Sequence, residues 1–260
     1  MFSLTGQSAL VSGGGSGIGR AIALDLGKAG VNVTLCGRRI EPLEETAQMI
    51  SDGGGTADAL VCDLSKPPAI EQLATQIIER NGGVDILINN AGFSSKVRSA
   101  RYISADEWRN VMDVNTLGPA ILTRSLLQPM IDRGRGHVVM ISSMAAIRPG
   151  VMAGVVYSSA KSAARAYMDV LSVEVRQHGI RCTTIFPGEV DTPIMKNRAL
   201  QPDNATLALM MQPEDISAAV MMAISLPERA NVSELMITAT FPRDMTADVD
   251  AALSKKTADE

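Results

Sequence analysis

The 260-residue sequence has few of the residues that build metal sites and disulfide frameworks, with two histidines and three cysteines. His137 and His178 are isolated from each other and from further ligands at the spacing of a metal site. We therefore expect no metal, and surface positions for both histidines. Cys36, Cys62 and Cys182 are odd in number and lie within or at the end of apolar runs, so we expect buried, reduced thiols.

Long apolar runs and an excess of positive charge are also missing. No apolar stretch reaches the roughly 20 residues that span a membrane, and Met1–Leu10 do not combine a basic region with a long apolar stretch, as a secretion signal does. The net charge is −4, with both signs interspersed, which disfavours a nucleic-acid or anionic-membrane partner. We expect a cytoplasmic protein with no membrane and no nucleic-acid partner.

What is present is a regular alternation of β-rich and helical segments. Seven short runs predict strands, at Ala9–Ser12, Val31–Cys36, Ala57–Val61, Val84–Ile88, His137–Ser142, Ile180–Phe186 and Leu235–Thr238. Helical periodicity marks the stretches between them, at Gly17–Ala29, Glu41–Ser51, Ala69–Arg80, Trp108–Arg133, Gly154–His178 and Glu214–Ser225.

This alternation is typical of a mainly parallel sheet covered by helices on both faces, which also explains strands that are continuously apolar. We predict an α/β fold, doubly wound and seven-stranded, with three layers. No repeat or linker divides the chain, so residues 1–260 are predicted to form a single domain with a polar tail at 250–260.

A glycine-rich turn joins the first predicted strand to the first predicted helix, with five glycines in the seven positions 13–19. At the start of a helix, the backbone N–H groups of such a turn can contact a pyrophosphate. A merely tight connection is the alternative, which the number of glycines disfavours. The residues expected at the pyrophosphate are Gly13, Gly15, Ser16, Gly17, Ile18 and Gly19.

The second predicted strand ends in Gly37-Arg38-Arg39, with no carboxylate. In dinucleotide-binding folds an acid at this point binds the ribose hydroxyls, whereas a basic residue accommodates a 2′-phosphate. Gly37 leaves space, and Arg38 and Arg39 can form charge-assisted bonds to phosphate. The pattern favours NADP(H) and leaves NAD(H) possible, since the arginines could also border a solvated loop.

Tyr157 and Lys161 are four residues apart, so in a helix their side chains emerge on one face about one turn apart. A phenol with an ordinary pKa near 10 is a poor acid or base at neutral pH, and a neighbouring ammonium lowers that pKa. The preceding strand ends in Ser142 and Ser143, whose hydroxyls are expected at the same edge of the sheet. We predict Tyr157 as a general acid/base.

The glycine spacing Gly13-x-x-x-Gly17-x-Gly19 resembles the TGxxxGxG turn of short-chain dehydrogenases, with Ser12 in place of the usual Thr. The resemblance continues through motifs in the family's order over nearly the whole chain, namely Asn89-Asn90-Ala91-Gly92, Asn115, Tyr157-x-x-x-Lys161 and Pro187-Gly188. It implies a Rossmann-type fold and hydride transfer between a nicotinamide and a small-molecule carbonyl or alcohol.

An NADPH-dependent carbonyl reductase is the function that these motifs favour. The alternatives are an NAD-dependent alcohol dehydrogenase of the same family and a dinucleotide-binding regulatory protein without turnover. An epimerase or dehydratase of the longer related families is disfavoured by its different glycine spacing and larger substrate domain.

The resemblance also implies roles for four catalytic residues. Tyr157 exchanges the proton of the substrate oxygen, Ser143 binds that oxygen, Lys161 also holds the nicotinamide ribose, and Asn115 helps to hold a water that links the lysine to solvent. In many relatives the serine precedes the tyrosine by thirteen positions, whereas Ser143 precedes Tyr157 by fourteen. We infer a one-residue insertion in the following loop, and Ser142 is the alternative.

Further cofactor contacts follow from the same resemblance. Asp63 and Leu64 are expected at the adenine, although an acid there could also cap the next helix. Asn89, Ala91 and Gly92 are expected to support the cofactor, and Asn90 is as well suited to a purely structural turn. The residues expected to line the nicotinamide are Pro187, Gly188, Val190 and Thr192.

A substrate loop is expected at about residues 192–213, where Met195, Leu207, Leu209, Met210 and Met211 predict a moderately apolar pocket. Relatives commonly pair through helices that correspond to Trp108–Arg133 and Gly154–His178. On the second of these, Ala163, Ala164 and Ala166 are expected to be exposed and to suit close helix contact. We expect a homodimer or homotetramer.

Overall fold

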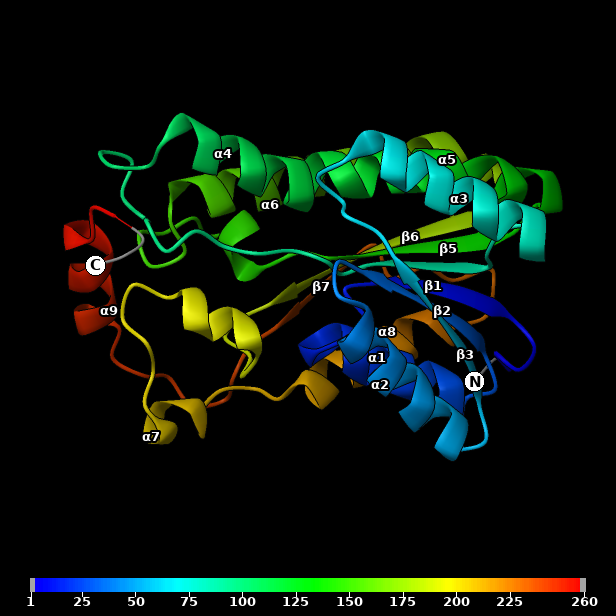
Figure 1. Ribbon diagram of the computed structural model, residues 1–260, viewed down its shortest axis with the longest axis horizontal. Coiled ribbons are helices and arrows are strands. Elements are labelled where there is room, and N and C mark those ends of the chain that lie inside the picture. The colour runs from blue at the N-terminus through cyan, green and yellow to red at the C-terminus, as the bar shows by residue number, and fades with distance from the viewer. Residues whose placement is uncertain (1–2, 258–260) are drawn as a thin grey trace.

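The computed structural model describes residues 3–257, which form a seven-stranded sheet between two layers of helices (Figure 1). The sheet has the order β3-β2-β1-β4-β5-β6-β7, and every neighbouring pair is parallel. The strands are β1 (Ser8–Ser12), β2 (Asn32–Gly37), β3 (Thr56–Val61), β4 (Ile86–Asn89), β5 (Gly136–Ile141), β6 (Ile180–Pro187) and β7 (Glu234–Ile237). The predicted doubly wound parallel sheet is confirmed.

Each face of the sheet carries three long helices. One face is covered by α1 (Gly17–Lys28), α2 (Ile40–Asp52) and α8 (Pro213–Ile224), and the other by α3 (Pro67–Asn81), α5 (Gly118–Arg133) and α6 (Val155–Val175) (Figure 1). Two apolar cores result, one on each side, with Ile22 and Val220 in the first and Leu122 and Met168 in the second. Because both faces of the central strands are buried, these strands are apolar throughout.

The strand order reverses at β1, which pairs with β2 on one side and with β4 on the other. The connections that follow β1 and β4 therefore leave the sheet in opposite directions. A crevice forms beyond the carboxyl ends of these two strands, where doubly wound proteins bind their ligands. The glycine-rich turn after β1 opens into this crevice.

The predicted helical stretch Trp108–Arg133 is helical throughout, but a π-helical segment interrupts its α-helical hydrogen bonding. The chain forms α4 (Ala105–Met112), then a π-helix at Asp113–Leu117 and then α5. Ser104 begins α4, and its side chain accepts a hydrogen bond from the Glu107 amide at 3.1 Å. Asn115 lies in the π-helix, a form that occurs mostly at functional sites.

Short helices occupy segments around the carboxyl edge, namely the 3₁₀ turns Met144–Ala146 and Pro193–Asn197, with α7 (Asn204–Leu207) and α9 (Thr246–Ser254). A further 3₁₀ turn, Arg176–His178, joins the end of α6 to the start of β6. Residues 250–254, the first part of the predicted polar tail, are helical, and Ala252 is buried. Residues 258–260 of that tail lie outside the described residues.

The predicted surface position of His137 is wrong, whereas His178 is exposed as expected. His137 is 2% exposed in β5, and its Nε2 lies 2.7 Å from Thr183 Oγ1 on the neighbouring strand β6. Burial, and after it the charge of Arg181, lower the pKa of His137 to about 3. The imidazole is therefore neutral at every pH near neutrality.

The three cysteines are free and buried, as expected from their place in apolar runs. Burial raises the pKa of Cys62 to about 11 and that of Cys182 to about 12, and it also raises that of Cys36. Within residues 3–257 no helix is long and apolar enough to cross a membrane, and no group of three or more His, Cys, Asp or Glu side chains could hold a metal ion.

Candidate active site

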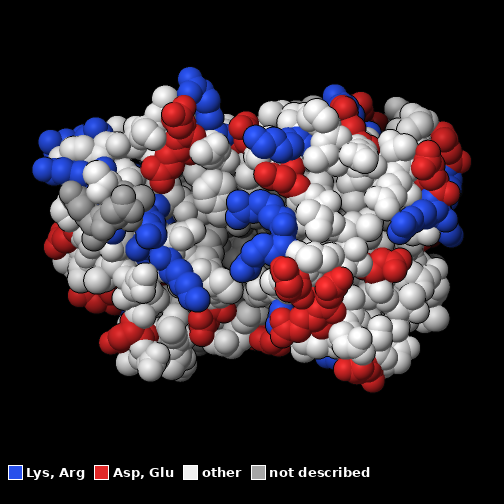
Figure 2. Space-filling model, viewed as in Figure 1, with Lys and Arg blue, Asp and Glu red and all other residues white. Residues whose placement is uncertain are grey.

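A cavity of about 960 Å³ opens at the carboxyl edge of the sheet. The cavity continues from the glycine-rich turn past the ends of β2, β3, β4 and β5 to the segment after β6. On the face shown in Figure 2, lysine and arginine side chains flank a hollow in the middle of the molecule. The cavity brings together most of the predicted site residues, namely Gly13, Gly15, Ser16, Gly17, Ile18, Arg38, Arg39, Asp63, Leu64, Ala91, Gly92, Ser143, Tyr157, Lys161, Pro187, Gly188, Val190 and Thr192.

Three predicted residues lie behind the cavity wall. A Cβ atom on Gly19 would lie 2.3 Å from the Gly13 carbonyl oxygen, so this glycine permits close packing of the turn. The Asn89 side chain donates to Thr123 Oγ1 at 2.9 Å inside the protein, and its contact with a cofactor stays a prediction. Asn115 is the third of these residues and is fully buried.

Ser12 and Asn90 tie the end of β1 to the end of β4. Ser12 Oγ accepts hydrogen bonds from the amides of Asn90 at 3.0 Å and Ala91 at 3.1 Å. Asn90 Nδ2 donates to the Ser12 carbonyl at 2.9 Å, and Asn90 also lines the cavity. Asn90 thus has the structural role that the sequence suggested, and it forms part of the wall as well.

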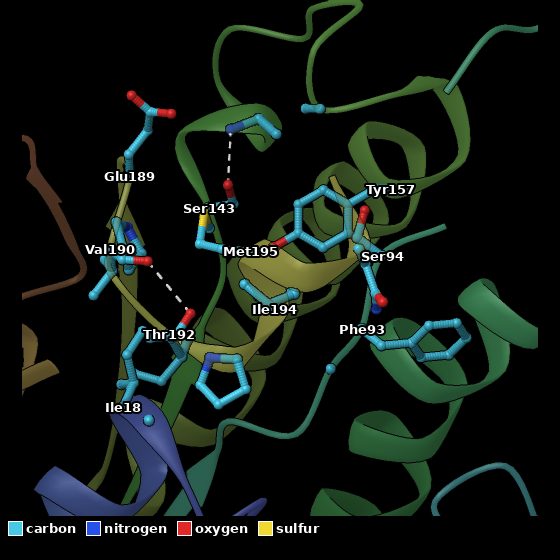
Figure 3. Close-up of a pocket in the computed structure, with 18 of the residues that line it drawn as sticks. Ile18, Phe93, Ser94, Ser143, Tyr157, Glu189, Val190, Thr192, Ile194 and Met195 are labelled. Carbon is cyan, nitrogen blue, oxygen red and sulfur yellow. Dashed lines mark hydrogen bonds between the residues drawn. The ribbon is translucent and has the colours of Figure 1, made fainter. Parts of the chain in front are cut away.

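Tyr157 lies in the first turn of α6, which begins after Gly154. Its ring points into the cavity, with the hydroxyl end toward Ser143 and Met195 (Figure 3). Ser143 precedes the short turn at Met144–Ala146, and its Oγ accepts a hydrogen bond from the Ala145 amide at 3.1 Å. Ser142 instead directs its hydroxyl to the Lys161 carbonyl at 3.4 Å, so Ser143 is the serine at the phenol.

The charges around Tyr157 differ from those expected from the sequence. Burial raises the pKa of Tyr157, while hydrogen bonding by Ser143 and the positive charges of Arg98 and Arg198 oppose the rise. Lys161 Nζ lies 5.7 Å from the centre of the Tyr157 ring and donates to the Ile141 carbonyl at 3.0 Å. Burial lowers the pKa of Lys161 to about 8, so its ammonium loses part of its charge just above neutral pH.

Asn115, Gly92 and Lys161 meet behind the phenol. Asn115 Nδ2 donates to the carbonyls of Phe93 and Val111, each at 2.9 Å, and its buried Oδ1 has no partner among the described residues. A Cβ atom on Gly92 would lie 2.6 Å from that Oδ1 and 3.4 Å from Lys161 Nζ. An unpaired buried oxygen next to a lysine is suited to a bound water that joins the two.

The sequence profile of the family described as short chain dehydrogenase matches residues 7–203. The chain belongs to the short-chain dehydrogenase family. An uncharacterised oxidoreductase of Staphylococcus aureus strain MRSA252 is 32% identical over 236 residues, which cover 90% of this chain and 97% of that protein.

Two solved structures of this family extend the comparison. A metagenomic short-chain oxidoreductase in complex with NADP is 31% identical, with a TM-score of 0.81 over 92% of this chain and 100% of that one. A variant of the actinorhodin polyketide ketoreductase with NADPH is 28% identical, with a TM-score of 0.82 over 92% of this chain and 98% of that one.

The residues at the crevice of this short-chain dehydrogenase fit a nicotinamide dinucleotide. Gly13 has a φ of +68°, which favours glycine, and a Cβ there would lie 2.9 Å from Asn90 Nδ2. Arg38 and Arg39 line the far end of the same cavity, after β2. Asp63 also lines it, and its Oδ1 accepts a hydrogen bond from the Ser65 amide at 2.9 Å; it does not cap the next helix, α3, whose N-cap residue is Lys66.

The substrate side of the cavity is more polar than the sequence predicted. Met195 and Leu209 line it, but Leu207 lines a smaller neighbouring pocket, and Met210 and Met211 are buried. Four arginines and one acid also line the cavity, and the sequence analysis did not single them out. They are Arg98, Arg148, Arg198, Arg243 and Glu189.

We expect Gly92→Ala to reduce turnover and to lower the free energy of unfolding by about 1–3 kcal/mol, because the new methyl group overlaps Asn115 and crowds Lys161. Steady-state kinetics and denaturant unfolding would measure the two effects. Gly150→Ala is the matched control, since Gly150 also lines the cavity but a Cβ there meets nothing within 4 Å. Equal turnover and equal free energies of unfolding in the two variants would contradict the close approach of Gly92 to Asn115.

Proposed function

We propose that the protein is an NADPH-dependent reductase of ketones or aldehydes that uses Tyr157 as its acid/base. The observation that carries the proposal is the meeting of the Tyr157 and Ser143 hydroxyls in a cavity that continues to the glycine-rich turn. Membership of the short-chain dehydrogenase family and the NADP-bound relatives support it. An NAD-dependent alcohol dehydrogenase and a regulatory dinucleotide-binding protein are the alternatives.

The proposed chemistry divides between a cofactor and the side chains. When bound, the nicotinamide supplies the hydride. Ser143 donates a hydrogen bond to the substrate oxygen, and Tyr157 transfers its hydroxyl proton to that oxygen as negative charge develops there. Lys161 stabilises the phenolate that remains, and the unpaired Oδ1 of Asn115 holds a water through which the proton is replaced.

The preference for NADPH rests on the end of β2. Gly37 leaves room there, and Arg38 and Arg39 line the cavity without a carboxylate at the strand end. An acid at this position would repel a 2′-phosphate, whereas a guanidinium binds phosphate through parallel hydrogen bonds. Burial raises the pKa of the Asp63 carboxyl, but hydrogen bonds from Ser65 and the nearby positive charge of Arg38 lower it, and the net shift is downward. Asp63 and Arg38 therefore lie close together at this end of the cavity.

We expect Arg38→Ala to weaken NADPH binding by about 10- to 100-fold and to change NADH binding by less than about 3-fold, because a charge-assisted bond to the 2′-phosphate is lost. Fluorescence titration of the purified variant with each nucleotide would measure both affinities. Arg109→Ala is the control, since Arg109 pairs only with Asp106 on the exposed face of α4. Equal weakening of NADPH and NADH would argue against a phosphate contact.

The experiment that tests the whole proposal is NADPH and NADH titration followed by NADPH oxidation with a panel of ketones and aldehydes. Tighter binding of NADPH and reduction of any carbonyl support the proposed reductase. Tighter NADH binding would favour the alternative cofactor. Binding without turnover in either direction would favour the regulatory protein.

The expected assembly and location rest on the same family membership. Pairing through α5 and α6 stays a prediction, and so does a cytoplasmic location. On α6, Ala166 is exposed as expected, but Ala164 is buried in the core of its own chain. Val170 and Val173 are instead the large apolar side chains that this helix exposes.

A further inference from the structure

Arg98 is a buried arginine in the wall of the active-site cavity. It is 5% exposed, and it packs against the start of the helix that carries Tyr157. Its carbonyl accepts a hydrogen bond from the Val155 amide at 3.1 Å, and a Cβ atom on Gly154 would lie 2.8 Å from its Cδ. Its charge is close enough to the phenol of Tyr157 to oppose the rise in pKa that burial causes.

The guanidinium of Arg98 has only neutral hydrogen-bond partners. It donates to Ser94 Oγ, to the Ala153 carbonyl at 2.6 Å and to the Asn197 carbonyl at 2.7 Å. Its Nε has no partner among the described residues, and in residues 3–257 no carboxylate lies within salt-bridge distance of it. Burial lowers the pKa of Arg98 to about 10, so the group is still charged at neutral pH.

The charges next to Arg98 balance without it. Arg198 pairs with Glu189 at 2.7 Å and with Asp248 at 3.3 Å, and Arg243 pairs with the same two carboxylates at 2.7 and 2.8 Å. Two cations and two anions thus form a half-buried cluster in which every charge has a partner. Glu107, the acid whose charge also acts on Arg98, is hydrogen bonded to Ser95.

Arg98 is thus a buried cation that forms no ion pair among the described residues, and the charge of Glu107 acts on it only from beyond salt-bridge distance. Burying an arginine without a counter-ion costs several kcal/mol unless something compensates. Three of its five N–H groups are used in the described bonds, so the guanidinium still has donors for a ligand. The exposed Arg148 lines the same cavity and adds positive potential at its wall.

We propose that the substrate carries a carboxylate, which Arg98 binds beside the carbonyl that Tyr157 protonates. The proposal rests on the proposed reductase function and narrows its substrates to short oxo acids, with hydroxy acids as products. A carboxylate accepts charge-assisted hydrogen bonds from N–H groups of Arg98 that the described bonds leave free.

The first test compares each oxo acid with its own methyl ester on the wild-type protein. The probes are 2-oxobutanoate and 3-oxobutanoate, each against its ester, with saturating NADPH. We expect kcat/KM to be about 10- to 100-fold higher for at least one acid than for its ester, as a charge-assisted bond predicts. Esters reduced as well as both acids, or better, would overturn the carboxylate proposal and leave the reductase function intact.

The second test uses Arg98→Gln, with Arg101→Gln as control because Arg101 is exposed and stacks on Tyr102. Arg98→Gln should raise KM for the preferred acid by about 10-fold or more and change KM for its ester by less than about 3-fold. Equal losses on both substrates would overturn the proposal in favour of a structural role. Arg98→Lys keeps the charge and should recover part of the acid preference.

A binding measurement keeps the proposal testable without turnover. With NADPH bound, butanoate should raise the midpoint of thermal unfolding in a saturable way, whereas butanamide should not. This holds even if Arg98→Gln fails to fold, since only the wild-type protein is needed. Equal shifts with the two probes, or none with either, would overturn the carboxylate site, whereas failure to reduce any carbonyl would count against the reductase function instead.

Discussion

Replacing Tyr157 with Phe is expected to reduce kcat by about 10²- to 10⁴-fold, the range for loss of a general acid/base. The phenol is the group whose proton reaches the substrate oxygen, and Phe preserves the ring while it removes that proton. The ring itself lies buried in the cavity beside Lys161, so its packing should persist. Steady-state kinetics with the best carbonyl substrate would measure the loss.

NADPH affinity should change by less than about 3-fold in the same variant, because the glycine-rich turn and the end of β2 are untouched. Tyr167→Phe is the matched control, since Tyr167 lies on the same helix and its hydroxyl bonds to α5, at the Ala120 carbonyl (3.4 Å) and Thr123, rather than in the cavity. Activity retained in Tyr157→Phe would rule out the proton-transfer role, and equal losses in both variants would indicate damage to α6 instead.

Acid is expected to destabilise the protein through His137. Burial, and to a smaller extent the charge of Arg181, lower the pKa of this imidazole to about 3 in the folded protein. In the unfolded chain the pKa of a histidine is about 6.5. The unfolded state therefore binds one more proton between these values. The contribution of the neutral His137 to the free energy of unfolding is fully present above pH 6.5. It is lost as the pH falls towards 3, at about 1.4 kcal/mol per pH unit.

Between pH 6.5 and 5.0 the free energy of unfolding should fall by about 2 kcal/mol from this group. Denaturant unfolding at several pH values would measure it. His137→Gln removes the titration and leaves an amide for Thr183, so its slope over this range should be shallower than that of the wild type. The exposed His178→Gln is the control, and identical slopes in His137→Gln and the wild type would contradict the prediction.

The fold could be predicted because its central strands are buried on both faces and therefore apolar throughout. All seven strands were found from short apolar runs, with ends that differ by a few residues from those in the structure. The helical stretch Trp108–Arg133 was predicted without its π-helical segment, because periodicity does not distinguish an α-helix from a π-helical insertion of five residues. His137 was misplaced because a lone histidine was judged by its polarity rather than by the buried strand that it begins.

The cofactor side of the candidate site was predicted from contiguous motifs, since each short segment after a strand places its own residues at the crevice. The cluster of Arg198 and Arg243 with two acids was not predicted, because its members are spread along the sequence from Glu189 to Asp248 and only the fold brings them together. Arg98 gave no periodic or motif signal.

The order of the strands also constrains how the chain acquires its structure. β1 can pair early with the nearby β2, through Ser8 and Asn32, but its other edge waits for Ile86 of β4. Until then the central strand presents an open apolar edge, which is prone to association with other chains. Parallel pairings between distant segments close slowly, so we expect folding on the scale of an α/β sheet rather than of a helical bundle.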